Sequence, residues 1–119
     1  MASRDRLTGG ELNGALTDEL VGVQTGYLGH GPKTAFTFYR GNVVVTVMHD
    51  VLTKAEKILA QTGRHGDVTE VHGLFRQEME VDFRAVVERL TGHKVLVFLS
   101  ASHIEPDVAA AIFILDDAV

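Results

Sequence analysis

The feature that most constrains the fold is a hairpin pattern near the middle of the sequence. From Thr34 to Tyr39, apolar and polar residues alternate, which is typical of a strand with one buried face. The pair Gly41-Asn42 then supplies a tight turn into Val43 to Met48, which is rich in valine on both faces. The chain must therefore build an antiparallel sheet, with the second of these strands central and the first better suited to an edge.

A second hairpin is predicted near the end of the chain. The segments from Val95 to Leu99 and from Val108 to Leu115 are continuously apolar and rich in residues that favour strands. The polar segment from Ser100 to Asp107 joins them. These segments predict two paired strands with a loop longer than a hairpin requires.

Three helices are expected around these strands. Thr8-Gly-Gly-Glu11 and Thr53-Lys-Ala-Glu56 both have the spacing of a capping box, and each is predicted to open a helix. The short helix after Thr53 should close at Thr62-Gly63, and the main core helix should end at Thr91-Gly92. The apolar positions of the first helix are Leu12, Leu16, Leu20, Val23 and Tyr27, and those of the core helix are Val71, Phe75, Met79, Phe83, Val86 and Leu90.

These elements predict an α+β fold: a four-stranded sheet built from two β-hairpins and covered by an N-terminal helix, a short helix and a long core helix. With 119 residues, the chain is expected to form one domain, residues 1–119. Its longest apolar run, Val108 to Leu115, is far shorter than the roughly 20 residues of a membrane span. We expect no direct membrane insertion and, because Met1 to Thr8 lacks the pattern of a secretory signal, a cytoplasmic location.

Composition excludes several functional classes. The chain has no cysteine, so disulfides, thiolate nucleophiles and zinc fingers are ruled out. The formal net charge is -5, which argues against binding to nucleic acid. The loop Gly29-His-Gly-Pro32 is similar to the Gly-x-x-Gly loop of RNA-binding KH domains, but its spacing differs and it lacks clustered basic residues.

Two local motifs admit both a structural and an anion-binding interpretation. Gly29, His30 and Gly31 form either a simple turn or a backbone nest for an anion. Thr53 either caps its helix or helps to hold an anion at the helix start, although Glu56 places a negative charge there.

Polar residues at the ends of strands form a candidate ligand-binding rim. If the second and third strands are adjacent and parallel, the loops that follow them share one edge of the sheet. Any metal there would need His and carboxylate ligands, and whether one binds is left open. The alternative is that these are ordinary solvated loop residues. The rim consists of His49, Asp50, Ser100, His103 and Asp107.

Enzymatic chemistry has little support in the sequence. Ser100, His103 and Asp107 are close together, but no Gly-x-Ser-x-Gly elbow precedes the serine. Arg76 is expected to form an ordinary ion pair with Glu80 on the surface of its helix. We expect no catalytic residues and no bound cofactor.

Several separated motifs resemble those of the MpsC-like family, named for a sodium-translocating, membrane-potential-generating system. The similarity covers roughly residues 11–116. It rests on Gly29-His-Gly-Pro32, the run Val51 to Lys57, the helix carrying Arg76, and the stretch from Thr91 through Ser100 and Asp107 to Phe113.

The resemblance implies a soluble, non-enzymatic accessory or regulatory subunit of a membrane system for ion movement or inorganic-carbon supply, with a protein of that system as its partner. The alternative function is that of a small metal- or anion-binding enzyme that uses the rim as its site. Independently, a chain this small with an apolar first helix is expected to form a homodimer through that helix.

Overall fold

The computed structural model describes residues 7–119. The element order of this part of the chain matches the predicted order of helix, hairpin, two helices and hairpin. The elements are α2 (Gly9–Leu28), β1 (Thr34–Arg40), β2 (Val43–His49), α3 (Lys54–Gln61), α4 (His65–Thr91), β3 (Val95–His103) and β4 (Val108–Leu115).

The four strands form one sheet in the order β1-β2-β4-β3, and all neighbours are antiparallel. This confirms the predicted α+β fold and the places of β1 at an edge and β2 in the interior. The condition that the second and third strands are adjacent is not met, because β4 lies between them. The two most continuously apolar strands, β2 and β4, occupy the interior, where both neighbours satisfy their backbone groups.

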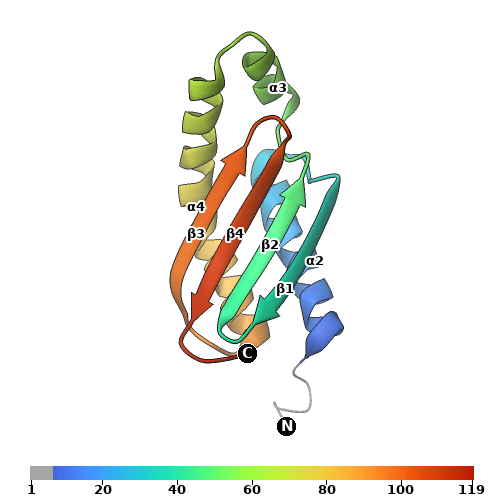
Figure 1. The fold of residues 1–119 in the computed structure, drawn as a ribbon, viewed down its shortest axis with the longest axis vertical. Coiled ribbons are helices and arrows are strands. Elements are labelled where there is room, and N and C mark those ends of the chain that lie inside the picture. Colours follow the sequence, from blue (N-terminus) through green and yellow to red (C-terminus); the bar gives the residue numbers. More distant parts are fainter. Residues whose placement is uncertain (1–6) are drawn as a thin grey trace.

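The molecule has two layers, a sheet and a layer of helices. Helices α2 and α4 lie on one face of the sheet, and α3 contacts α4 beyond the end of β2 (Figure 1). Phe83 of α4, Phe98 of β3 and Phe113 of β4 pack in series with tilted rings, whose centroids are 6.0 Å and 5.2 Å apart. The core is thus confined to the space between the helices and one face of the sheet.

The two predicted capping boxes have different outcomes. At Thr53, both hydrogen bonds are formed: Glu56 N–H donates to Thr53 Oγ1, and Thr53 N–H donates to Glu56 Oε1 at 2.9 Å. At Thr8, the residue is the N-cap of α2 but its side chain makes no capping hydrogen bond, so that box is absent. Since α2 packs along its length on the sheet and α4, tertiary contacts stabilise it without the box.

Two element boundaries differ from the prediction. Strand β3 continues to His103, so the predicted loop from Ser100 to Asp107 shrinks to the residues after the strand. The reason is that the backbone of residues 100–103 continues to pair with residues 108–111 of β4. Helix α4 begins at His65, six residues before Val71, the first apolar position predicted for the core helix.

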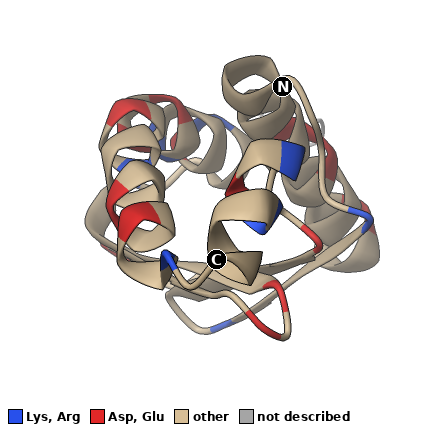
Figure 2. Ribbon diagram, turned by 90° about the horizontal axis from the view of Figure 1, so that it is seen from above, with Lys and Arg blue, Asp and Glu red and all other residues tan. Residues whose placement is uncertain are grey.

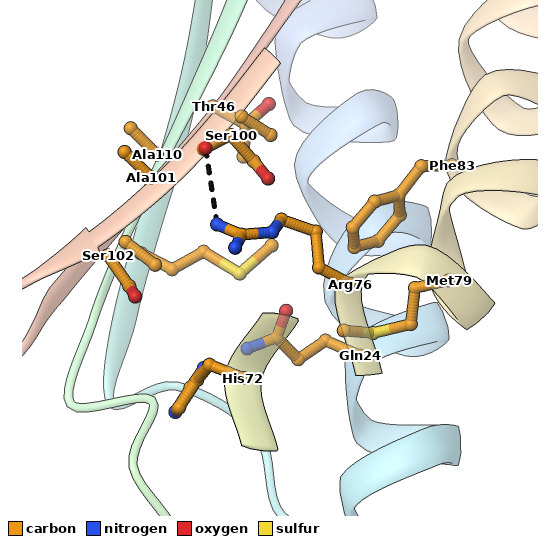
Figure 3. A pocket seen from close by; sticks show the side chains of 13 residues that line it. Gln24, Thr46, His72, Arg76, Met79, Phe83, Ser100, Ala101, Ser102 and Ala110 are labelled. Carbon is orange, nitrogen blue, oxygen red and sulfur yellow. Dashed lines mark hydrogen bonds between the residues drawn. The ribbon is translucent and has the colours of Figure 1, made fainter. Parts of the chain in front are cut away.

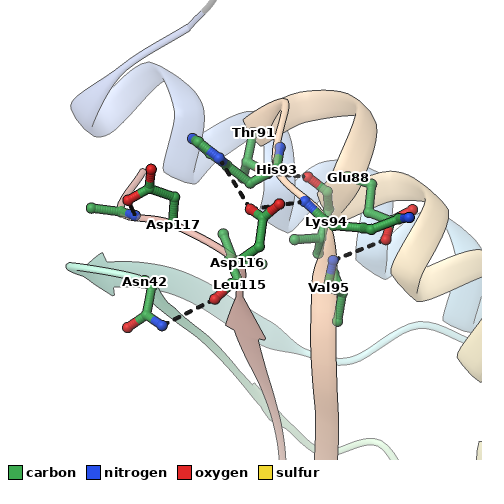
Figure 4. Close-up of polar contacts among 11 residues, drawn as sticks. Asn42, Glu88, Thr91, His93, Lys94, Val95, Leu115, Asp116 and Asp117 are labelled. Carbon is green, nitrogen blue, oxygen red and sulfur yellow. Dashed lines mark hydrogen bonds and ion pairs between the residues drawn. The ribbon is translucent and has the colours of Figure 1, made fainter.

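The end of the sheet nearest the C-terminus is held by polar contacts (Figure 4). The Asn42 side chain donates to the carbonyl of Leu115 at 3.0 Å, which ties the β1–β2 turn to the end of β4. The carboxylate of Glu88 on α4 accepts from the backbone N–H of Val95 at 2.9 Å. These bonds fix the helical layer and the sheet relative to each other at this end.

Candidate functional site

The rim residues lie at one end of the sheet but on different faces. His49 and His103 are both opposite Val108 in the register, one on each side of β4. Two strand spacings separate them, roughly 10 Å. Ser100 lies opposite Ala111 and belongs to the other face, which the helices cover.

The two rim carboxylates differ in what they contact. Asp107 accepts the backbone N–H groups of Val51 and Leu52 at 3.1 Å and 2.9 Å, and its own carbonyl accepts from the N–H of Asp50. Asp107 therefore holds the connection between β2 and α3 in place. Asp50 is a non-glycine residue with a φ of 59°, which lets the chain turn sharply after β2.

His103 makes a hydrogen-bond contact within its own hairpin. His103 Nδ1 lies 2.8 Å from the carbonyl of Pro106, within its own hairpin. Among residues 7–119, no group of three or more His, Asp or Glu side chains is arranged to hold a metal ion. The fold brings these residues to one end of the sheet, with Ser100 on the covered face, and ligand binding there stays a prediction.

The loop of Gly29, His30 and Gly31 ends α2. Gly29 has a φ of 72°, in the left-handed region, and its N–H donates to the carbonyl of Thr25. This geometry is typical of a glycine that ends an α-helix. A side chain at position 31 would meet Thr25 Oγ1 at 2.7 Å, so a larger residue there would require the Thr25 side chain to move. His30 is exposed. Gly29 and Gly31 thus meet structural needs of the turn, and anion binding there stays a prediction.

A buried acid links α3 to α4. Glu56 is only 5% exposed, and its Oε2 lies 2.7 Å from Nε2 of His72. Burial alone would raise the pKa of Glu56, but the hydrogen bonds from His72 and Thr53, with the charge of His72, bring it below its ordinary value. Glu56 is therefore ionised at neutral pH and serves both as a cap and as a tie between helices.

Arg76 does not form the predicted pair with Glu80. Its Nη1 donates across to the carbonyl of Ser100 on β3 at 3.2 Å, while Glu80 pairs with Arg84 at 2.8 Å. The reason is that Arg76 lies on the side of α4 that faces the sheet. There it lines a cavity that sequence reasoning missed (Figure 3).

The expected dimer interface on the first helix is also corrected. Leu12, Leu16 and Leu20 are at most 1% exposed, because they pack into the chain's own core. A helix beside the sheet buries its apolar face there first, and little of that face remains for a partner. Figure 2 shows that acidic and basic residues are carried largely by the helices and loops.

An exposed apolar surface lies instead on the face of the sheet that the helices do not cover. Phe36 and Phe38 of β1 are 49% and 48% exposed, and Leu99 of β3 is 52% exposed. None of the residues on this open face is Asp or Glu. By strand register, the open face comprises Thr34, Phe36, Phe38 and Arg40; Val43, Val45, Val47 and His49; Val108, Ala110, Ile112 and Ile114; and Val97, Leu99, Ala101 and His103.

A family model described as "Na+-translocating membrane potential-generating system (MpsC)" matches residues 8–117, almost the whole chain. The chain belongs to the MpsC family. No curated protein and no solved structure matches it significantly. In the described part of this MpsC-family protein, no helix has the length and apolar character needed to cross a membrane.

Proposed function

We propose that this MpsC-family protein is a non-enzymatic accessory or regulatory subunit of a membrane system that moves ions or inorganic carbon. It acts at the cytoplasmic side of the membrane as a homodimer. The family description supplies the setting, and the open face of the sheet is the observation that carries the proposed mode of action. An uncovered apolar face of this extent is typical of a protein contact surface.

The occupant of the open face is a second copy of this chain. Strands about 4.8 Å apart that rise about 3.4 Å per residue give four strands of seven residues a footprint of roughly 19 Å by 24 Å. Protruding side chains enlarge this footprint and bring its accessible area toward the roughly 800 Å² per partner that stable interfaces bury. Two such faces would pack about 10 Å apart, as in a β-sandwich.

Charge favours the same occupant. The chain carries 16 acidic residues against 11 Lys and Arg, so two copies repel each other over most of their surfaces. The open face has no carboxylate, and Arg40 is its only Lys or Arg. It is therefore the surface on which two acidic chains approach each other with the least repulsion.

Sodium-dependent membrane potential tests the accessory role. We expect cells that lack this protein to develop a smaller potential when Na⁺ is supplied, measured with a voltage-sensitive dye. Wild-type protein should restore the potential, and the variant Phe36→Asp/Phe38→Asp should not. Leu74→Asp is the matched control, because Leu74 is 59% exposed on α4, outside the open face.

An unchanged potential in cells lacking the protein would overturn the accessory role. Restoration by the double variant to the wild-type level would show that the open face plays no part in it. Either result can be read only after immunoblotting has shown equal amounts of each variant.

A further inference from the structure

A half-enclosed cavity lies on the covered side of the sheet, between the strands and helices α2 and α4 (Figure 3). Its volume is about 50 Å³. Such a volume has room for roughly three or four water molecules, or for a compact organic molecule of similar size.

The cavity exists because small residues face the helices at this end of the sheet. Ser100 lies opposite Ala111, and Ser102 lies opposite Ala109. Farther along the same two strands, the facing pair is Phe98 and Phe113, and there the core is filled. The small side chains of β3 and β4 at these positions therefore create the cavity.

A guanidinium group lies at the wall of this cavity. One N–H of the Arg76 guanidinium donates to the carbonyl of Ser100. The other N–H groups of the guanidinium remain available as donors. Within residues 7–119, Arg76 has no ion pair, in contrast to Arg64, Arg84 and Arg89. No Asp or Glu lines the cavity. The other ionisable group at the wall is His72, whose Nε2 is directed to the buried Glu56.

Two further polar groups, Gln24 and Ser100, line the cavity. Gln24 of α2 is 7% exposed, and its amide points into the cavity beside Arg76 (Figure 3). The Oγ of Ser100 is buried without a hydrogen-bond partner. Buried polar groups in native proteins are normally satisfied, so donors left free around one hollow indicate a ligand that accepts hydrogen bonds.

We propose that this cavity binds a short aliphatic monocarboxylate of two to four carbons. The planar guanidinium of Arg76 matches a carboxylate, and Gln24 and Ser100 donate to its oxygens. The aliphatic end packs on the apolar part of the wall, formed by Met48, Met79 and Phe83. Acetate to butyrate has four to six non-hydrogen atoms, which agrees with the volume.

Calorimetry with the full chain tests this site with propionate as the probe. We expect a dissociation constant of roughly 0.1–1 mM, a range accessible to ligands of so few atoms. Propionamide has the same shape without the charge and should bind at least about tenfold more weakly. In a ¹⁵N-labelled sample, propionate should shift the side-chain amide resonances of Gln24.

Two arginines provide a matched pair of variants. Arg76 and Arg84 both lie on α4 and both donate to a β3 carbonyl, but only Arg76 lines the cavity. Arg76→Gln should weaken propionate binding at least about tenfold, and Arg84→Gln should leave it unchanged. Ser100→Ala removes only an unpartnered hydroxyl, so it should fold normally and still weaken binding several-fold.

Three results of these experiments would overturn the proposal, and a fourth would come from competing anions. They are no propionate binding below about 10 mM, far above the range open to such ligands; equal binding of propionamide; and equal affinities in Arg76→Gln and Arg84→Gln. Chloride or phosphate binding as tightly as propionate, at the same residues, would also reject a carboxylate site.

Discussion

The two faces of the four-stranded sheet carry similar side chains but meet different neighbours. On the covered face, Val44 and Phe113 have no exposed surface, because α2 and α4 pack over them. On the open face, Phe36 and Phe38 are about half exposed even though they are as apolar. The sequence of β2, which is Val-rich on both faces, suits a strand covered on both sides.

This difference agrees with the proposal that a second copy of the chain covers the open face of the sheet. Sheets with both faces apolar are normally packed on both. The uncovered face therefore favours a partner layer, and the charge argument favours a second copy of the same sheet. The covered face should control the stability of the fold, and the open face should control association.

The largest expected effect on stability is in the covered face. Phe113→Ala should lower the free energy of unfolding by about 3–5 kcal/mol, because it leaves a cavity among Phe83, Phe98 and Val44. Phe38→Ala on the open face should cost no more than about 1 kcal/mol in the monomer. Urea denaturation at low protein concentration measures both. Equal losses would show that the two faces are not distinct in this way.

A smaller effect is expected where the helical layer is tied together. Glu56→Gln replaces the buried carboxylate that holds Thr53 and His72, and should cost about 2 kcal/mol at neutral pH. The pKa of Glu56 lies below its ordinary value of 4.5 in the folded protein. Its contribution to stability is therefore complete above that value and is lost as pH falls through the folded-state pKa.

The pH dependence provides the check on Glu56. Urea denaturation of the wild type between neutral pH and pH 3 should show a loss of stability below about pH 4.5. The Gln variant should show a smaller loss over the same interval. If both proteins lose stability in parallel, the carboxylate of Glu56 is not what joins α3 to α4.

The smallest effect is expected at the rim. Asp107→Asn keeps one acceptor oxygen for the backbone N–H groups of Val51 and Leu52, and should cost about 1 kcal/mol. His103→Ala, on the exposed end of β3, should change the melting temperature little. Calorimetry with zinc, manganese and bicarbonate separates a structural rim from a binding rim. Binding that His103→Ala abolishes would restore the rim as a ligand site.

Much of the fold follows from local signals in the sequence. The Gly41-Asn42 turn and the capping box at Thr53 depend on neighbouring residues, and the structure confirms both elements. The strand order could not be predicted in the same way. From their sequences, β2 and β3 could pair with each other or lie on either side of β4. Only the packing of the whole sheet decides that β4 lies between them.

The candidate sites were harder to predict because they depend on long-range placement. Sequence spacing suggested that Arg76 pairs with Glu80, whereas the fold brings its guanidinium to the carbonyl of Ser100. The small residues that face each other on β3 and β4 indicate the cavity. Their pairing, however, can be recognised only when the register of the two strands is known. Asp107 likewise reveals its role only when Val51 is placed beside it.

Light scattering tests the open face most directly. The wild-type protein at tens of micromolar should have twice the chain mass of 12.9 kDa, and Phe36→Asp/Phe38→Asp should have the chain mass itself. Leu74→Asp, which changes an apolar residue on α4 that is at least as exposed, should remain dimeric. A monomeric wild type, or a dimer that the double variant leaves intact, would contradict association through the open face of the sheet.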